Sequence, residues 1–131
     1  MKDLTRYIGI PYSSKGRSFE SLDCYGLVFV FYREELGIDV PDYLDSYESA
    51  TSRASVSTAI RDNLPNWKPV VAMEYGDLLV FDILGLPIHV GVYLGDNQFL
   101  HAFQRTDSCI ERLNSITWSR RLVGAFRWQQ N

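Results

Sequence analysis

The sequence predicts an α+β fold in which helices from the first half of the chain pack on an antiparallel sheet from the second half. Between residues 23 and 37, an aspartate, a long apolar run and a glycine follow one another, which is the pattern of a buried helix. Beyond residue 69 the apolar runs become short, often alternate with polar residues, and are separated by Gly, Asp, Asn or Pro. We therefore expect N-terminal helices on a central antiparallel sheet of about five to six strands.

The best-defined element is the helix predicted over residues 24–36. Asp23 precedes it as a suitable N-cap, and Gly37 follows it at the C′ position, where glycine commonly ends helices. Its apolar side chains lie on nearly all sides, so this helix should be central and buried. The β-branched residues of the run also suit a buried strand, but the cap, the glycine and the length favour a helix.

Two weaker helical patterns lie on either side of the central one. Residues 3–10 predict a short helix, and residues 11–18 follow it as a loop because they are rich in Pro, Ser and Gly. Residues 46–64 have a mildly helical, polar pattern that Pro65 ends. We expect this last helix to lie at the periphery.

The second half of the chain contains the predicted strands. Each is a short apolar or alternating run bounded by turn-forming residues. They span residues 77–83, 88–94, 98–103, 108–113 and 122–128. Together they predict the antiparallel sheet on which the helices pack.

Length and charge narrow the classes of protein to which the chain can belong. At 131 residues it has the usual size of one domain, and we take residues 1–131 as a single domain. The net charge is −3 and the 13 basic residues form no stripe, which disfavours nucleic-acid binding through phosphate neutralisation. The start of the chain has no apolar run long enough for a signal peptide or membrane span. We expect a protein that is made in the cytoplasm and does not insert into a membrane.

Both histidines of the chain lie on the two arms of one predicted hairpin. Its turn is expected at residues 95–97, so that Leu94 pairs with Gln98. In this register His89 and His101 share one face of the sheet as diagonal neighbours, with Cβ atoms about 7 Å apart. A loop of two or four residues would put them on opposite faces, because a shift by one residue reverses every side chain.

A cysteine at the first position of the central helix suggests nucleophilic catalysis. The first-turn amides of a helix favour an anion, so we expect a lowered pKa for Cys24 and a reactive thiolate. His89 would act as the general base, and His101 would hold its ring in the right tautomer and orientation. The three residues together form a nucleophile, a base and an orienting group.

Each of these residues also has an ordinary structural explanation. A cysteine in an apolar stretch is more often a packed side chain, and a histidine in a strand is often a satisfied polar residue. One cysteine and two histidines can also bind zinc, although their spacing is unlike that of a zinc knuckle. Cys109 has no histidine near it in sequence, so we expect it in the core. The two cysteines lie too far apart for a disulfide framework and should be free thiols in a reducing compartment.

Three linked motifs resemble the NlpC/P60 family of cell-wall peptidases. The stretch "LDCYGLVFVFYREELGI" is similar to the family's Asp-Cys-x-Gly-Leu-Val helix start, and "GIPYSSKGRS" to the Gly-x-Pro-Tyr loop before it. The stretch "YGDLLVFDILGLPIHVGVYLGDNQFLHAF" resembles its Gly-Asp-Leu, His-Val-Gly-(Ile/Val)-Tyr and His-Ala strands. The resemblance covers about residues 5–128. It implies a papain-like α+β fold with Cys24 as nucleophile, His89 as base and His101 as the polar third member.

The resemblance also implies roles for residues around the nucleophile. Tyr12, with a backbone amide near Cys24, would help to stabilise the oxyanion. Asp23 matches the residue before the nucleophile, although capping the helix explains it equally well. Tyr25 stands where many members have the serine that recognises the free amine of the substrate.

Taken together, the likeness implies a cysteine peptidase or amidase that cleaves peptidoglycan stem peptides, often between D-glutamate and diaminopimelate or lysine, without a cofactor or metal. Tyr25 on a short chain resembles the version found in phage tail-tip assembly proteins, which implies tail-tip partners and a place in the virion or at the cell wall. One alternative is a structural tail-tip module with little catalysis. Another is an acyltransferase of the permuted relatives, which ranks low because their histidine strand precedes the cysteine helix.

Overall fold

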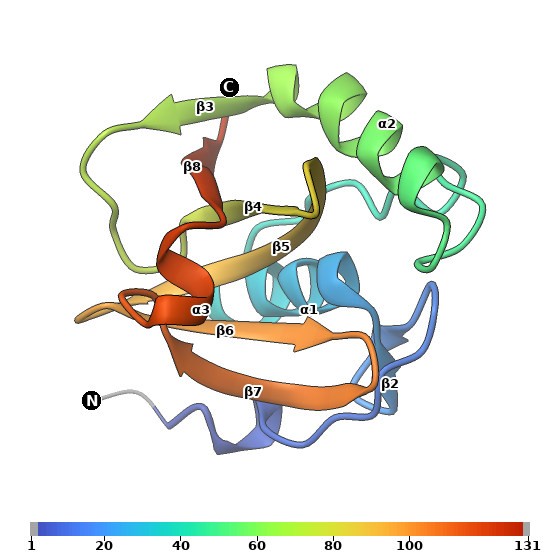
Figure 1. The fold of residues 1–131 in the computed structure, drawn as a ribbon. Coiled ribbons are helices and arrows are strands. Elements are labelled where there is room, and N and C mark those ends of the chain that lie inside the picture. The colour runs from blue at the N-terminus through green and yellow to red at the C-terminus, as the bar shows by residue number, and fades with distance from the viewer. Residues whose placement is uncertain (1–2, 130–131) are drawn as a thin grey trace.

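A six-stranded antiparallel sheet lies at the centre of the molecule (Figure 1). The computed structural model describes residues 3–129, and the strands follow the order β3-β8-β4-β5-β6-β7 across the sheet. The predicted α+β fold and the predicted kind of sheet are thus confirmed. The strands are β3 (Trp67–Val70), β4 (Leu78–Ile83), β5 (Leu86–Gly95), β6 (Gln98–Phe103), β7 (Thr106–Arg112) and β8 (Leu122–Trp128).

The central helix begins and ends where the sequence predicts. Asp23 has an extended backbone and accepts a hydrogen bond from the Gly26 amide at 2.8 Å, so α1 (Cys24–Phe31) starts at the cysteine. The helix continues as a π-helical segment, Tyr32–Leu36, and stops at Gly37, whose φ of 66° is left-handed. The wider final turns are the feature that the apolar pattern did not predict.

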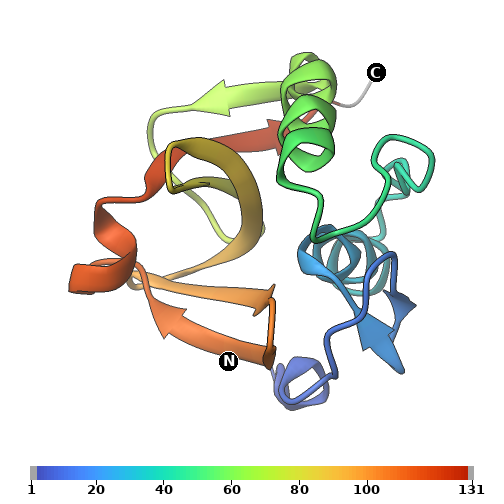
Figure 2. The ribbon, with the colours of Figure 1, turned by 45° about the vertical axis from the view of Figure 1, so that its right-hand side comes forward.

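Both faces of the sheet are covered, as the alternation along its strands explains. Even-numbered residues of β4–β6, such as Val80, pack with the apolar residues of α1. Odd-numbered residues, such as Phe81, pack on the other face with Trp118 of the short helix α3 (Ile116–Ser119). Figure 2 shows α1 and α2 (Arg53–Asn63) on one side of the strongly curved sheet and α3 on the other. The sheet is therefore buried between two apolar layers.

The β5–β6 hairpin has a shorter turn than predicted and a bulge beside it. Residues 96–97 form the turn, both with positive φ, and Gln98 pairs with the last residue of β5 rather than with Leu94. A register shift at Leu94 then compensates, and Val92 lies opposite Leu100 as the predicted register requires. The two-residue turn alone would put the histidines on opposite faces, and the bulge returns them to the same one.

The N-terminal segment contains less helix and more strand than predicted. Within residues 3–10 the helical part is one 3₁₀ turn, η1 (Thr5–Tyr7). The predicted loop contains β1 (Arg17–Ser18), which pairs with β2 (Ser21–Leu22) in a small hairpin just before α1. Backbone pairing therefore fixes the loop that leads to the cysteine.

The helix α2 is shorter than the predicted span of residues 46–64, and one face of it is buried. It packs on β5, buries Val56 and Ala59, and passes into a 3₁₀ turn, η3 (Leu64–Asn66). Strand β3 and helix α3 were not predicted; Pro69 is tolerated in β3 because this strand lies at the edge of the sheet. No helix within residues 3–129 has the length and apolar character needed to cross a membrane.

Candidate active site

Cys24 and His89 line the same cavity, beside the N-terminus of α1. The cavity has a volume of about 90 Å³ and lies between α1, α2, β4 and β5. The thiol is near the backbone amide of Val90, the residue that follows His89. Cys24 as a whole residue is half-buried, and it lines this cavity. Residues from the two halves of the chain therefore meet, as the sequence predicts.

The two histidines are joined directly by their rings. His89 Nε2 and His101 Nδ1 lie 2.8 Å apart, with the ring planes at 71°. Gly91 lies between them on the same face, and a Cβ there would be 3.3 Å from the Cβ of His101. The absence of a side chain at this position leaves room for the pair, and the predicted neighbourhood of the two imidazoles is confirmed.

Aromatic rings enclose the histidine pair on the sheet face opposite to α1. The Trp118 ring centroid lies 5.4 Å from that of His89 and 4.9 Å from that of His101. Phe81 and Phe103 contact His89 at centroid distances of 5.6 and 4.8 Å. Sequence reasoning missed Trp118, because α3 is a single short turn whose packing depends on the whole sheet.

This enclosure keeps both imidazoles uncharged. Burial lowers the pKa of His89 well below its usual value, and the nearby His101 and Arg121 lower that pKa further. Burial also lowers the pKa of His101, although Glu111 opposes the effect. At neutral pH both rings are therefore neutral, which is the state a general base needs before it accepts a proton.

The pKa of Cys24 is raised, and the predicted lowering is wrong. Burial is the largest cause and, with the adjacent Asp23 carboxylate, raises this pKa to about 12. The backbone amides of Val90 and Tyr25 favour the thiolate, so the expected effect of the helix start is present but outweighed. Among residues 3–129, the side-chain hydrogen bond of His89 goes to His101, and none reaches the Cys24 sulfur. The ligand-free site therefore holds a neutral thiol and a neutral imidazole at one cavity.

Tyr12 also lines this cavity, in a half-buried position. A backbone bridge between Tyr12 and Leu22 fixes it next to the start of α1. Burial raises the pKa of its phenol, and the nearby Cys24 and Asp23 raise that pKa further. The hydroxyl therefore stays protonated and can donate a hydrogen bond into the cavity.

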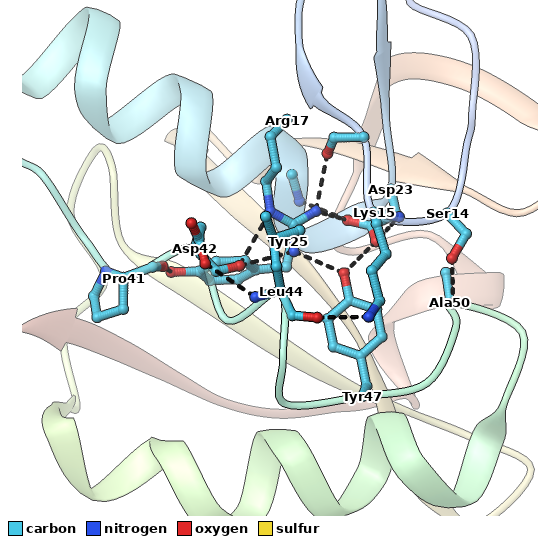
Figure 3. A network of polar contacts seen from close by, with 12 residues as sticks. Ser14, Lys15, Arg17, Asp23, Tyr25, Pro41, Asp42, Leu44, Tyr47 and Ala50 are labelled. Atoms are coloured by element: carbon cyan, nitrogen blue, oxygen red, sulfur yellow. Dashed lines mark hydrogen bonds and ion pairs between the residues drawn. The ribbon is translucent and has the colours of Figure 1, made fainter.

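Asp23 is buried, and its carboxylate accepts hydrogen bonds from four donors (Figure 3). Its Oδ1 accepts from the Gly26 amide and from Arg17 Nη1, each at 2.8 Å. Its Oδ2 accepts from the Lys15 amide at 2.8 Å and from the Tyr47 hydroxyl. Both oxygens are thus engaged within the protein, and the structure confirms Asp23 as the helix cap.

Tyr25 and Arg17 hold residues 41–47 beside the site. The Tyr25 hydroxyl donates to the Pro41 carbonyl at 2.7 Å. Arg17 donates to the Asp42 carbonyl through Nε at 3.1 Å and Nη2 at 2.9 Å (Figure 3). Tyr25 lines the cavity with its ring, while its hydroxyl binds this neighbouring segment.

Glu111 is a residue beside the histidines that sequence reasoning missed. Its Oε2 lies 2.5 Å from His101 Nε2. Glu111 is on β7, which pairs with β6, the strand of His101. The predicted strand over residues 108–113 already contained Glu111, and pairing it with the strand of His101 could have found it, because side chains two residues apart share a face.

Cys109 lies directly opposite His101 in the same pair of strands, and it is half-buried rather than in the core as expected. Donor atoms of His101, Cys109 and Glu111 all lie within 4.8 Å of one another, so these three residues could hold a metal ion. The direct hydrogen bond between His101 and Glu111 accounts for the arrangement without one.

The helix α2 forms an apolar wall of the cavity, a role that the sequence did not indicate. Its side chains face β5 and shield the region around Cys24 and His89. The wall consists of Val56, Ala59, Ile60 and Leu64, with Trp67 at its end. The side of the cavity formed by this wall is therefore largely apolar.

Comparison with known proteins is consistent with this geometry. Residues 9–127 match the NlpC/P60 family. The murein DD-endopeptidase MepS/murein LD-carboxypeptidase of Escherichia coli K12 is 33% identical over 119 residues, which are 91% of this chain and 56% of that protein. The probable endopeptidase YafL of the same strain is 33% identical over 128 residues, 95% of this chain and 47% of that protein. The chain thus spans about half the length of these curated relatives.

Solved structures lead to the same family. An NlpC/P60 protein from Bacillus cereus has a TM-score of 0.70 and 25% identity, covering 95% of this chain and 37% of that one. An NLP/P60 protein from Staphylococcus aureus, described as similar to lipoprotein, has a TM-score of 0.68 and 28% identity, covering 96% and 39%. With the motif order, the papain-like arrangement of cysteine helix and histidine strands, and the match over residues 9–127, the chain belongs to the NlpC/P60 family.

Proposed function

We propose that the chain is a cysteine peptidase that hydrolyses peptide bonds in the stem peptides of peptidoglycan. The observation that carries the proposal is that Cys24 and His89 line one cavity, and that the His89 ring is bonded to His101. Similar proteins are named murein DD-endopeptidase and probable peptidoglycan endopeptidase, which supports the same class of bond for this chain.

In this mechanism Cys24 is the nucleophile and His89 carries its proton. When an amide carbonyl occupies the cavity, the thiol proton passes to the neutral imidazole and the sulfur attacks the carbonyl carbon. Protonated His89 then gives the proton to the leaving amine as the C–N bond breaks, which leaves a thioester on Cys24. His89 next takes a proton from water, the resulting hydroxide attacks the thioester, and the proton returns to the leaving sulfur.

The oxyanion formed in each step needs hydrogen-bond donors that are already in place. The Tyr12 hydroxyl is one candidate, because it lines the cavity and its raised pKa keeps it protonated. The Tyr25 amide, in the first turn of α1 beside the sulfur, is the other. Donors of this kind stabilise the transition state without any rearrangement during the reaction.

The neighbours of the nucleophile support cleavage within a peptide rather than next to a free substrate amine. Both oxygens of Asp23 already accept hydrogen bonds, and the Tyr25 hydroxyl is bound to the Pro41 carbonyl. The Asp23 carboxylate thus has four donors within the protein, and the Tyr25 hydroxyl is held by residue 41 of the neighbouring segment. The apolar wall from α2 suits a small apolar residue, such as alanine, near the scissile bond.

Mass spectrometry of muropeptides tests the activity and identifies the bond. Purified peptidoglycan is incubated with the unaltered protein, with Cys24→Ala, and with Cys109→Ala as the matched control. We expect new stem-peptide fragments from the unaltered protein and from Cys109→Ala, and none from Cys24→Ala. Fragments released by folded Cys24→Ala would refute the mechanism.

Unaltered muropeptides, with folding verified by circular dichroism, would instead favour a structural module that keeps the fold with little or no catalysis. The biological setting stays a prediction. We propose a place in a phage tail tip or delivery to the cell wall, supported by Tyr25 in the position after the nucleophile. Detection of the chain by mass spectrometry in purified virions would support the tail-tip setting, and its absence from them would contradict it.

A further inference from the structure

Glu111 ends a chain of hydrogen bonds that starts at the proposed base. His89 Nε2 lies 2.8 Å from His101 Nδ1, and His101 Nε2 lies 2.5 Å from Glu111 Oε2. Both ring nitrogens of His101 are therefore engaged, one by each neighbour. Trp118 and Phe103 pack around the rings, so this chain of hydrogen bonds starts in the buried interior and reaches the surface at the half-exposed Glu111.

The Glu111 carboxylate determines which ring nitrogens of the two histidines carry a proton. An ionised carboxylate only accepts hydrogen bonds, so His101 must donate from Nε2. Neutral His101 then has an unprotonated Nδ1, which can only accept, and His89 must donate from Nε2. Neutral His89 in turn has its lone pair on Nδ1. The remaining nitrogen of the base is thus the one free to take a proton from Cys24 or from water.

We propose that Glu111 is a positioning residue that sets the tautomers of both histidines and makes Nδ1 of His89 the basic atom. This inference rests on the proposed function and adds a fourth residue to it. Without the carboxylate, the buried pair can adopt the opposite arrangement, with protons on His101 Nδ1 and His89 Nδ1. In that arrangement His89 presents an N–H to the cavity and cannot accept a proton.

The tautomers can be measured directly, because the chain contains two histidines and hence two imidazole signals. Histidine ¹⁵N chemical shifts distinguish a protonated from an unprotonated ring nitrogen. In inactive Cys24→Ala we expect both rings to carry their proton on Nε2. In Cys24→Ala with Glu111→Gln we expect a mixture of the two arrangements, because an amide can both accept from and donate to His101 Nε2.

Kinetics tests the consequence for the reaction. Glu111→Ala and Glu111→Gln should lower kcat by about 10- to 100-fold and leave KM within about twofold, because general-base catalysis contributes roughly 10²- to 10⁴-fold and part of it survives. Asp107→Asn is the matched control, since it removes a carboxylate from an exposed position on the same strand. That variant should keep the unaltered kcat.

Two results would overturn the proposal: His101 protonated on Nδ1 while Glu111 is intact, or an unchanged kcat in folded Glu111→Ala. The spectrum needs no turnover, so it still decides the tautomers if peptidoglycan proves not to be the substrate. In that case the alkylation rate of Cys24 in a Cys109→Ala background replaces kcat. A Glu111→Ala substitution that leaves this rate unchanged likewise contradicts the proposal.

Discussion

Cys24 lies in the first turn of α1, where amide dipoles favour a negative charge, and also in a half-buried position beside the Asp23 carboxylate. The dipole effect at a helix start is worth about 0.3–1 kcal/mol in most settings. Removing a thiolate from water costs more than this, so burial decides the sign of the shift. The sulfur is therefore present as a thiol, and in the proposed mechanism it becomes nucleophilic by giving its proton to His89.

The reactivity of Cys24 in the ligand-free protein should show this raised pKa of about 12. At pH 8 the thiolate fraction is lower than for an ordinary cysteine, whose pKa is about 8.5, and it grows as the pH rises. In the Cys109→Ala variant, where Cys24 is the remaining thiol, we expect alkylation by iodoacetamide to be slow at pH 8 and to accelerate up to pH 10. A rate that levels off below pH 8 would show a lowered pKa instead.

Sequence reasoning placed the cysteine and both histidines close together, because a capped helix and a hairpin position them by local rules. It missed Glu111 and Trp118, since their roles depend on which strands and helices become neighbours. It also predicted the wrong direction for the pKa of Cys24. The pattern shows a helix start, but the burial of the thiol follows from the packing of the whole domain.

Among the elements, α1 depends on a close approach between its first turn and the preceding loop. A Cβ on Gly26 would lie 1.9 Å from the Gly16 carbonyl oxygen, so the two backbones are in direct contact there. This contact holds the cysteine end of the helix against the β1–β2 hairpin. The glycine is therefore required by packing, despite its poor helix propensity.

Gly26→Ala should destabilise the protein although alanine is the better helix former. The gain in helix propensity is about 1 kcal/mol, whereas overpacking against a backbone atom typically costs about 1–3 kcal/mol and often more at such a short distance. We expect a net loss of about 2 kcal/mol in the free energy of unfolding, measured by urea denaturation. A variant of unchanged or greater stability would show that the loop moves away at no cost.

The helix α2 and the β5–β6 hairpin both differ from the predictions. The polar sequence of α2 indicated a peripheral helix, yet the few apolar residues of this helix form a wall of the cavity. In the hairpin, positive φ at Asp96 and Asn97 makes a two-residue turn, and the bulge restores the register. Neither a sparse apolar face nor a bulge has a strong signal in a single sequence.

Filling the cavity from α2 should block the substrate rather than the chemistry. Ala59 lines the cavity, and Ala59→Leu adds apolar volume to its wall. We expect kcat/KM for muropeptides to fall by about tenfold or more, a loss of about 1.4 kcal/mol in transition-state binding. The alkylation rate of Cys24 by a small reagent should change little. An equal loss in both assays would mean that the substitution disturbs the site itself.

On the scale of the whole molecule, the site is assembled from segments that lie far apart in sequence. The hairpin before α1, the start of α1, and residues 41–47 are tied together through one guanidinium (Figure 3). Arg17 bonds Asp23, the Asp42 carbonyl and the Tyr47 hydroxyl, while its side chain is only 10% exposed. The fold class could be predicted from local patterns, but this convergence of three segments could not.

Arg17→Ala should therefore cost far more than the loss of a surface ion pair, whose contribution is usually below about 1 kcal/mol. The side chain of Asp23 is 2% exposed, so the substitution leaves a buried carboxylate without its charged partner. Such a change typically costs about 3–5 kcal/mol, and we expect a loss of this size in urea denaturation. Arg17→Lys is the matched control, because it keeps the charge but cannot reach three acceptors from one planar group. Its free energy of unfolding should lie between that of the unaltered protein and that of Arg17→Ala. If the free energy of unfolding of Arg17→Ala lies within about 1 kcal/mol of that of the unaltered protein, the other donors suffice for Asp23. The cysteine end of α1 would then not depend on Arg17.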